Sequence, residues 1–168
     1  KKGEEQEAFA AYDSCLQWKD DNVMALNNYA YYLSEKGVDL HKAEAMSYKT
    51  IKAEPNNGTY LDTYAWILFM EERYADAKTY IDQALKNRDS TADNSTVLEH
   101  AGDIYYMNGI ADESVDFWKK AYTGENQTEV LAWKIKNRQY ITEEELKKRN
   151  APKQKPAATK KSVRKGKN

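Results

Sequence analysis

The sequence predicts an all-α protein built from antiparallel helix pairs, and three observations support this prediction. Apolar residues in the first 140 positions recur at steps of three and four, the spacing of one face of a helix. No segment alternates apolar and polar residues as a half-buried strand does. The 168 residues include only 7 Gly and 3 Pro, too few for the many turns of an all-β chain.

The expected helices follow one another along the chain and are separated by residues that break helices. Their apolar faces cover, in order, residues 8–16, 26–33, 43–51, 61–68, 77–85, 98–105, 115–122 and 130–140. Gly37 and Gly109 end two of them, and Pro55 ends a third. The apolar face over residues 130–140 indicates a last helix, with residues 143–149 as a candidate extension.

Charge divides the chain into two parts. Residues 151–168 hold 7 of the 26 bases and no acid, so residues 1–150 carry 19 bases against 27 acids, a net charge of −8. The C-terminal segment has too few apolar side chains to offset its ordering entropy, so we expect it to be disordered. The sequence therefore predicts a helical repeat domain over residues 1–150 and a basic tail over residues 151–168.

Small residues recur with a nearly constant period. Ala30 and Ala65 are 35 positions apart, and Ala65 and Gly102 are 37 apart because the loop over residues 89–95 is longer. The second helices carry small residues at similar intervals, namely Ala8, Ala43 and Ala77. A fixed period of this length indicates a repeat architecture. Small side chains are expected where the two helices of a pair approach closely, because a larger one would overpack the contact.

The repeat resembles the tetratricopeptide repeat, whose pattern is W-x2-L-G-x2-Y…A-x3-F…P. The three copies are Leu26-x2-Tyr29-Ala30-x2-Leu33…Ala43-x3-Ser47…Pro55, Leu61-x2-Tyr64-Ala65-x2-Leu68…Ala77-x3-Ile81 and Leu98-x2-Ala101-Gly102-x2-Tyr105…Ser114-x3-Trp118. The resemblance covers roughly residues 3–122 and implies a right-handed α-solenoid of about three full repeats. The resemblance also implies an N-terminal half repeat over residues 4–18 and a solvated C-terminal capping helix over residues 127–140. We expect the natural protein to extend further N-terminally; the alternative is that residues 4–18 serve as a cap.

The resemblance also implies a binding surface. In this family the first helix of each repeat lines a concave face on which peptides lie. Side chains directed toward that face should stand three residues before the small Ala or Gly, one after it and four after it. The candidate peptide-binding residues are Asn27, Tyr31, Asp62, Trp66, Phe69, Glu99, Asp103 and Tyr106, and Ser34 occupies the remaining position.

The composition of this groove predicts the kind of partner. It combines aromatic rings with carboxylates and includes no lysine or arginine, whereas chaperone-binding members of the family hold an acidic C-terminus with lysine and asparagine. Like charge would weaken an acidic peptide's binding. We expect a protein or peptide partner that is apolar or basic, with the aromatic rings as anchors. The alternative interpretation is that Trp66 and Phe69 pack between neighbouring repeats.

The sequence predicts neither catalysis, nor a cofactor, nor a metal site. It contains no glycine-rich phosphate loop, no nucleophile elbow and no His-Glu-x-x-His run. His41 and His100 share no cysteine or carboxylate at ligand spacing, and Cys15 falls on an apolar stripe that favours a structural thiol. No apolar run approaches the roughly 20 residues that span a bilayer. A non-enzymatic interaction scaffold is the favoured function.

Two alternative functions stay open at this stage. The basic tail would suit attachment to nucleic acid or to an anionic membrane surface. The chain would also suit an accessory repeat segment of a larger enzyme, because it starts inside a repeat. The tyrosine-rich repeats resemble those of bacterial envelope proteins, often lipoproteins. The expected location is therefore the periplasm or the outer membrane, with cytoplasm or nucleus as alternatives.

Overall fold

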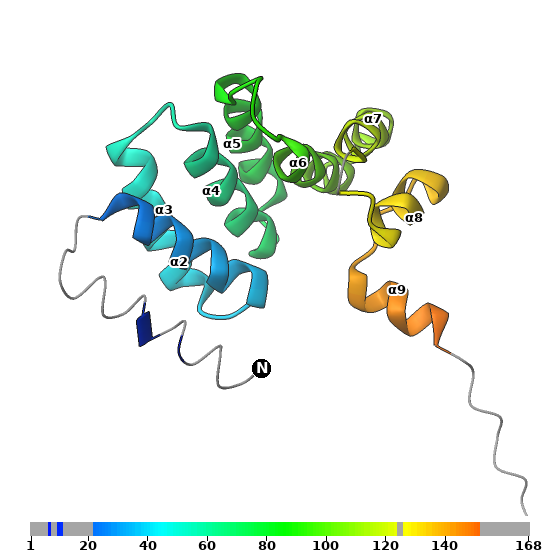
Figure 1. Cartoon of the computed structure of the whole chain (residues 1–168), viewed down its shortest axis with the longest axis horizontal. Helices are drawn as coiled ribbons and strands as arrows, with labels where there is room; N and C mark the ends of the chain where they lie inside the picture. Colours follow the sequence, from blue (N-terminus) through cyan, green and yellow to red (C-terminus); the bar gives the residue numbers. More distant parts are fainter. Residues whose placement is uncertain (1–6, 8–9, 12–21, 124–125, 152–168) are drawn as a thin grey trace, which may run out of the picture.

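The structure is a computed structural model that describes residues 7, 10–11, 22–123 and 126–151 (Figure 1). Within these residues the protein is all-α, and its eight helices pack in consecutive pairs, as predicted. The expected half repeat over residues 4–18 lies almost entirely outside the described residues, as do Cys15 and the tail after residue 151. None of the described helices is long and apolar enough to cross a membrane.

Three helix pairs form the body of the protein. α2 (Val23–Lys36) pairs with α3 (Leu40–Ala53), α4 (Gly58–Met70) with α5 (Tyr74–Asn87), and α6 (Ser95–Met107) with α7 (Ala111–Ala121). The pairs stack in chain order, because α3 also contacts α4 and α5 also contacts α6. The first helices touch one another as well, α2 with α4 and α4 with α6, so they form one continuous row (Figure 1).

The C-terminal cap consists of two helices rather than the one expected over residues 127–140. α8 (Glu129–Asn137) packs on α7 and ends at Arg138, whose backbone is left-handed with φ 53°. α9 (Glu143–Asn150) then begins with a capping box, in which Thr142 and Glu145 each accept a hydrogen bond from the other's backbone N–H. These two local signals break the helix and start a new one. Asn150 Nδ2 donates to Glu129 Oε1 at 3.0 Å and ties the end of α9 to the start of α8.

Local sequence explains most of the other helix boundaries. The Asn22 side chain accepts from the Ala25 N–H at the start of α2, and the Asn57 side chain accepts from the N–H groups of Thr59 and Tyr60 at the start of α4. Gly37 ends α2 in the left-handed conformation with φ 64°, where a side chain would be strained.

The small residues lie where paired helices meet, as the repeat period predicts. Ala30 and Ala65 are fully buried, and Gly102 is buried against α7. A Cβ atom at Gly102 would stand 2.3 Å from Trp118 Cδ1 and 2.4 Å from its Nε1. Trp118 itself is fully buried, so its ring has no free space to move into. Gly102 therefore sets how closely α6 and α7 approach.

We expect Gly102→Ala to lower the free energy of unfolding by about 1–3 kcal/mol, because the new methyl group overpacks the contact with Trp118. The gain in helix propensity of about 1 kcal/mol offsets part of this loss. Chemical denaturation measures the change. The same substitution in a Trp118→Leu background should cost less, and an equal cost in both backgrounds would contradict the proposed contact.

Candidate functional site

All eight candidate binding residues lie on the row of first helices, and they differ in burial. Tyr31, Trp66, Glu99 and Tyr106 are half-buried, whereas Asn27, Asp62, Phe69 and Asp103 are buried. Whether any of them contacts a partner stays a prediction. Their surroundings decide which of them still have unused hydrogen-bonding atoms or accessible surface.

Two adjoining cavities run along the row of first helices. The larger, about 590 Å³, lies at the N-terminal ends of α4 and α6 and includes Asn27, Tyr31 and Asp62 in its wall. The smaller, about 410 Å³, lies toward the α8–α9 connection and includes Trp66, Glu99 and Asp103. Tyr31 and Thr96 line both cavities, so the two form one groove. Phe69 and Tyr106 line neither of them.

The aromatic candidates make contacts within the protein. Trp66 stacks on Phe69 with ring centroids 4.8 Å apart and on His100 with centroids 4.1 Å apart. Its Nε1–H donates to Glu35 Oε1 at 2.9 Å. Phe69 is only 5% exposed and also packs edge-on against Tyr140 of the α8–α9 connection, so it packs inside the protein. Tyr31, which lies in both cavities, is the aromatic ring best placed to meet a ligand.

Asp62 pairs with a histidine from the next repeat. His100 Nδ1 lies 2.9 Å from Asp62 Oδ1, and both side chains are largely buried. Burial lowers the pKa of His100, but the charge of Asp62 and the hydrogen bond to it outweigh burial, and the net pKa is raised. The contact with Asp62 therefore favours the charged form of His100 relative to a free imidazole.

A lysine from the cap enters the third repeat. Lys134 Nζ lies 2.8 Å from Asp103 Oδ1, 2.9 Å from Asp103 Oδ2 and 3.1 Å from Glu99 Oε1. Trp118 Nε1–H donates to Asp103 Oδ1 at 2.9 Å. Burial raises the pKa of the Asp103 carboxyl, and Lys134 and the indole N–H oppose that shift. Both carboxylate oxygens of Asp103 are therefore used in contacts within the protein.

The expected groove without cations is wrong at this end, because Lys134 lines the smaller cavity and is only 3% exposed. Sequence reasoning placed this lysine on a solvated cap. A signal was present, since Lys134 stands between Leu131 and Ile135 on the apolar stripe of its helix. Glu35 and His100 also line the smaller cavity. Neither was among the predicted binding residues, because neither stands at one of the three repeat positions expected to face the groove.

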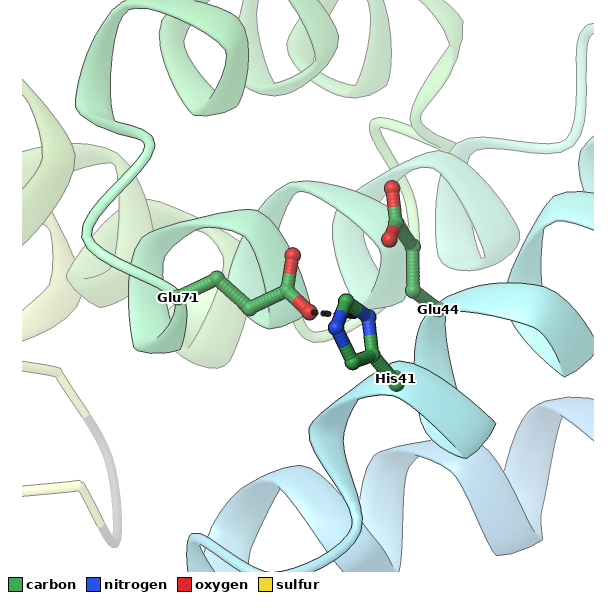
Figure 2. Close-up of side chains that lie close together, drawn as sticks. All are labelled: His41, Glu44 and Glu71. Carbon is green, nitrogen blue, oxygen red and sulfur yellow. Dashed lines mark ion pairs between the residues drawn. The ribbon is translucent and has the colours of Figure 1, made fainter.

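A second cluster of ionisable residues lies away from the groove (Figure 2). His41 and Glu44 on α3 approach Glu71 at the end of α4, and their potential ligand atoms all lie within 4.8 Å of one another. Arg73 Nη1 is 2.7 Å from Glu44 Oε1 and 3.3 Å from Glu71 Oε2. Its guanidinium already compensates the two carboxylates, and a metal ion would have to displace it. We assign the cluster to ion pairing between repeats.

The stacked helix pairs, the small residues between them and the groove along the first helices define a tetratricopeptide-repeat fold. Domains of this class are commonly protein–protein interaction modules. The structure is similar to the NMR structure of the first TPR domain of the human RPAP3 protein, with a TM-score of 0.59 and 13% sequence identity. That similarity covers 69% of this chain and 88% of the RPAP3 domain.

One sequence relative carries the same kind of repeat. The chain is 35% identical over 66 residues to the TPR repeat-containing protein PA4667 of Pseudomonas aeruginosa. The match covers 39% of this chain and 11% of that protein, so the chain spans a small part of the relative's length. No model of a known protein family matches the chain.

Replacing Lys134 by Met should destabilise the protein by roughly 3–5 kcal/mol at neutral pH, because Asp103 and Glu99 lose the charge that compensates them. Without Lys134 the already raised pKa of Asp103 rises further. Protonation then stabilises the folded variant, so the deficit should shrink as the pH falls through that pKa. Denaturation curves across this pH range measure the effect. Lys136→Met, on the exposed side of α8, is the matched control.

Asn27→Leu should raise the free energy of unfolding by about 1–2 kcal/mol, because it replaces a buried amide whose Oδ1 accepts no hydrogen bond from the described residues. Asn28→Leu, the same change at the exposed neighbour, should alter stability by less than about 0.5 kcal/mol. Thermal unfolding compares the two variants. A loss of stability in Asn27→Leu would mean that the amide has a partner in the folded protein.

Proposed function

We propose that this protein is a non-enzymatic scaffold that holds a segment of a partner polypeptide along the row of first helices. The continuous groove formed by the two cavities is the observation that carries this proposal. Cavities of this size are typical of ligand sites, and here they adjoin across helices from three successive repeats. A bound segment would lie across α2, α4 and α6, with Tyr31 at its centre.

The charge of the groove favours a basic or apolar segment over an acidic one. Among the described residues, the cations that line the two cavities are Arg88 and Lys134, apart from His100. The carboxylates that line them are Glu35, Asp62, Asp89, Asp93, Glu99, Asp103 and Glu143. This excess of negative charge would steer a basic segment toward the groove and would repel an acidic one.

The alternatives drawn from the sequence stay predictions. Attachment to nucleic acid or a membrane surface depends on the tail, and a role beside an enzyme depends on sequence outside this chain. The envelope location is likewise a proposal that rests on the style of the repeats. The groove within residues 22–143 supports the scaffold function independently of all three.

The proposal predicts that peptides selected from a random displayed library by the full chain will be rich in lysine, arginine and apolar residues and poor in acids. Thr96→Lys should weaken the selected peptides at least tenfold, because Thr96 is exposed and lines both cavities. Thr79→Lys, the same substitution at an exposed position on the second helix α5, is the control. Fluorescence anisotropy gives the Kd values.

Two results would contradict the scaffold proposal. Selected peptides could bind Thr96→Lys as tightly as the unmodified protein, which would place binding outside the groove. Enrichment of acidic peptides would equally contradict it, because the groove carries an excess of carboxylates.

A further inference from the structure

Three polar side chains occupy equivalent positions in the three repeats. Asn27, Asp62 and Glu99 each stand three residues before the small residue of a first helix. Glu99 receives Lys134 from α8, at 3.1 Å, and Asp62 receives His100 from α6, at 2.9 Å. Asn27 receives no donor from the described residues, since its Oδ1 is buried without a hydrogen-bond partner. Two of the three equivalent side chains therefore have a basic partner, and the Asn27 oxygen has no partner among the described residues.

Lys134 shows how this face of the protein holds an ammonium group. The side chain is 3% exposed, and its Nζ meets two carboxylates at 2.8–3.1 Å. The same Nζ lies 5.9 Å from the ring centroid of Trp118 and 5.3 Å from that of Tyr140. Carboxylate oxygens and aromatic faces together compensate the cost of removing the charge from water.

The larger cavity also brings a carboxylate, an amide and an aromatic ring together, and one oxygen of that carboxylate is already paired with His100. Asn27 is 5% exposed and Asp62 is 9% exposed, and both line this cavity. Asp62 uses Oδ1 for His100, and among the described residues its Oδ2 makes no hydrogen bond. Tyr31 adds an aromatic ring to the same wall. A buried polar atom left without a partner costs roughly 1–3 kcal/mol, so Asn27 is a site that a donor would stabilise.

The rim of the cavity carries negative charge, which attracts an ammonium group. Residues 87–94, which contain the longer loop of the repeat, place Asp89 and Asp93 there, both exposed. Arg88 is the one cation that the described residues contribute to the wall, and its Nη1 donates to the Leu85 carbonyl oxygen at 2.7 Å. Of the described residues in the wall, three are carboxylates, namely Asp89, Asp93 and the His100-paired Asp62, against this one arginine.

We propose that this cavity binds the primary ammonium of a lysine side chain from the partner segment, with Asn27 Oδ1 and Asp62 Oδ2 as acceptors. The inference rests on the proposed scaffold function and names the residue type that anchors the partner. A compact ammonium with three donors suits two acceptors on neighbouring helices, whereas the planar guanidinium of arginine is matched to a single carboxylate. The lysine stem would lie along Tyr31.

The test is isothermal titration calorimetry of the full chain with an acetylated and amidated tetralysine peptide. Tetra-arginine and Nε-acetylated tetralysine of the same length are the comparison probes. Tetralysine should bind at least tenfold more tightly than either. The chain's own lysines are present in every variant, so they are constant across the comparison.

Two substitutions test the acceptors. Asp62→Asn keeps an acceptor for His100 but removes the negative charge. Asn27→Leu removes the amide without leaving a buried polar atom. Each substitution should weaken tetralysine binding at least tenfold. Asp112→Asn removes the same charge from an exposed position on α7, and Asn28→Leu makes the same change beside Asn27; both should bind as the unmodified protein does. Because Asn27→Leu is expected to stabilise the fold, lost binding there cannot come from unfolding.

Several outcomes would overturn the inference. They are no detectable binding of tetralysine, equal affinity for tetra-arginine, and unchanged affinity in Asp62→Asn or Asn27→Leu. Equal weakening by Asp112→Asn would indicate diffuse charge attraction and would also overturn it. If Thr96→Lys abolishes binding of the library peptides while Asp62→Asn and Asn27→Leu do not affect them, the lysine site fails and the scaffold function stands.

Discussion

The close approach of helices at small residues is the constraint on which the remaining structure depends. Ala30 and Ala65 are fully buried in their pairs, and Gly102 leaves no room for a Cβ atom beside Trp118. This contact fixes the spacing within each pair, and the stacking of pairs then brings α2, α4 and α6 into one row. The groove runs along this row, and Tyr31 and Thr96 line both of its cavities.

The carboxylates of α4 and α6 in this row pair with basic side chains two helices further along the chain, on α6 and α8. His100 reaches back to Asp62, and Lys134 reaches back to Glu99 and Asp103. The cap thus completes the electrostatics of the third repeat as well as covering its apolar face. Such buried pairs rarely add much net stability, but removing one member leaves a charge without a partner. They link successive repeats, whereas Asn27 Oδ1 in the first repeat accepts no hydrogen bond from any residue that the structure describes.

Local and periodic features of the sequence were sufficient for the fold. The apolar steps predicted the helices, the small-residue period predicted their pairing, and Gly37 and Pro55 marked real ends. Helix over residues 143–149 was a candidate extension, but the break before it was not predicted, because that break depends on a left-handed residue, Arg138, and on the capping box of Thr142 and Glu145. Both are short-range signals, yet a continuous apolar pattern over residues 130–140 concealed them.

The sequence by itself determined that the chain forms paired helices with a row of first helices, because period and packing volume depend only on residue types and spacing. Only the tertiary structure decided which groups in that row remain available. Asp103 contacts Lys134 and Trp118, and Phe69 is buried by packing. Among the described residues, Asn27 Oδ1 has no hydrogen-bond partner, and the hydrogen bond of Asp62 is made by Oδ1. The physical reason is that satisfaction of a polar atom depends on a donor from another helix. The position of that donor is fixed by three-dimensional packing and leaves no regular mark in the sequence.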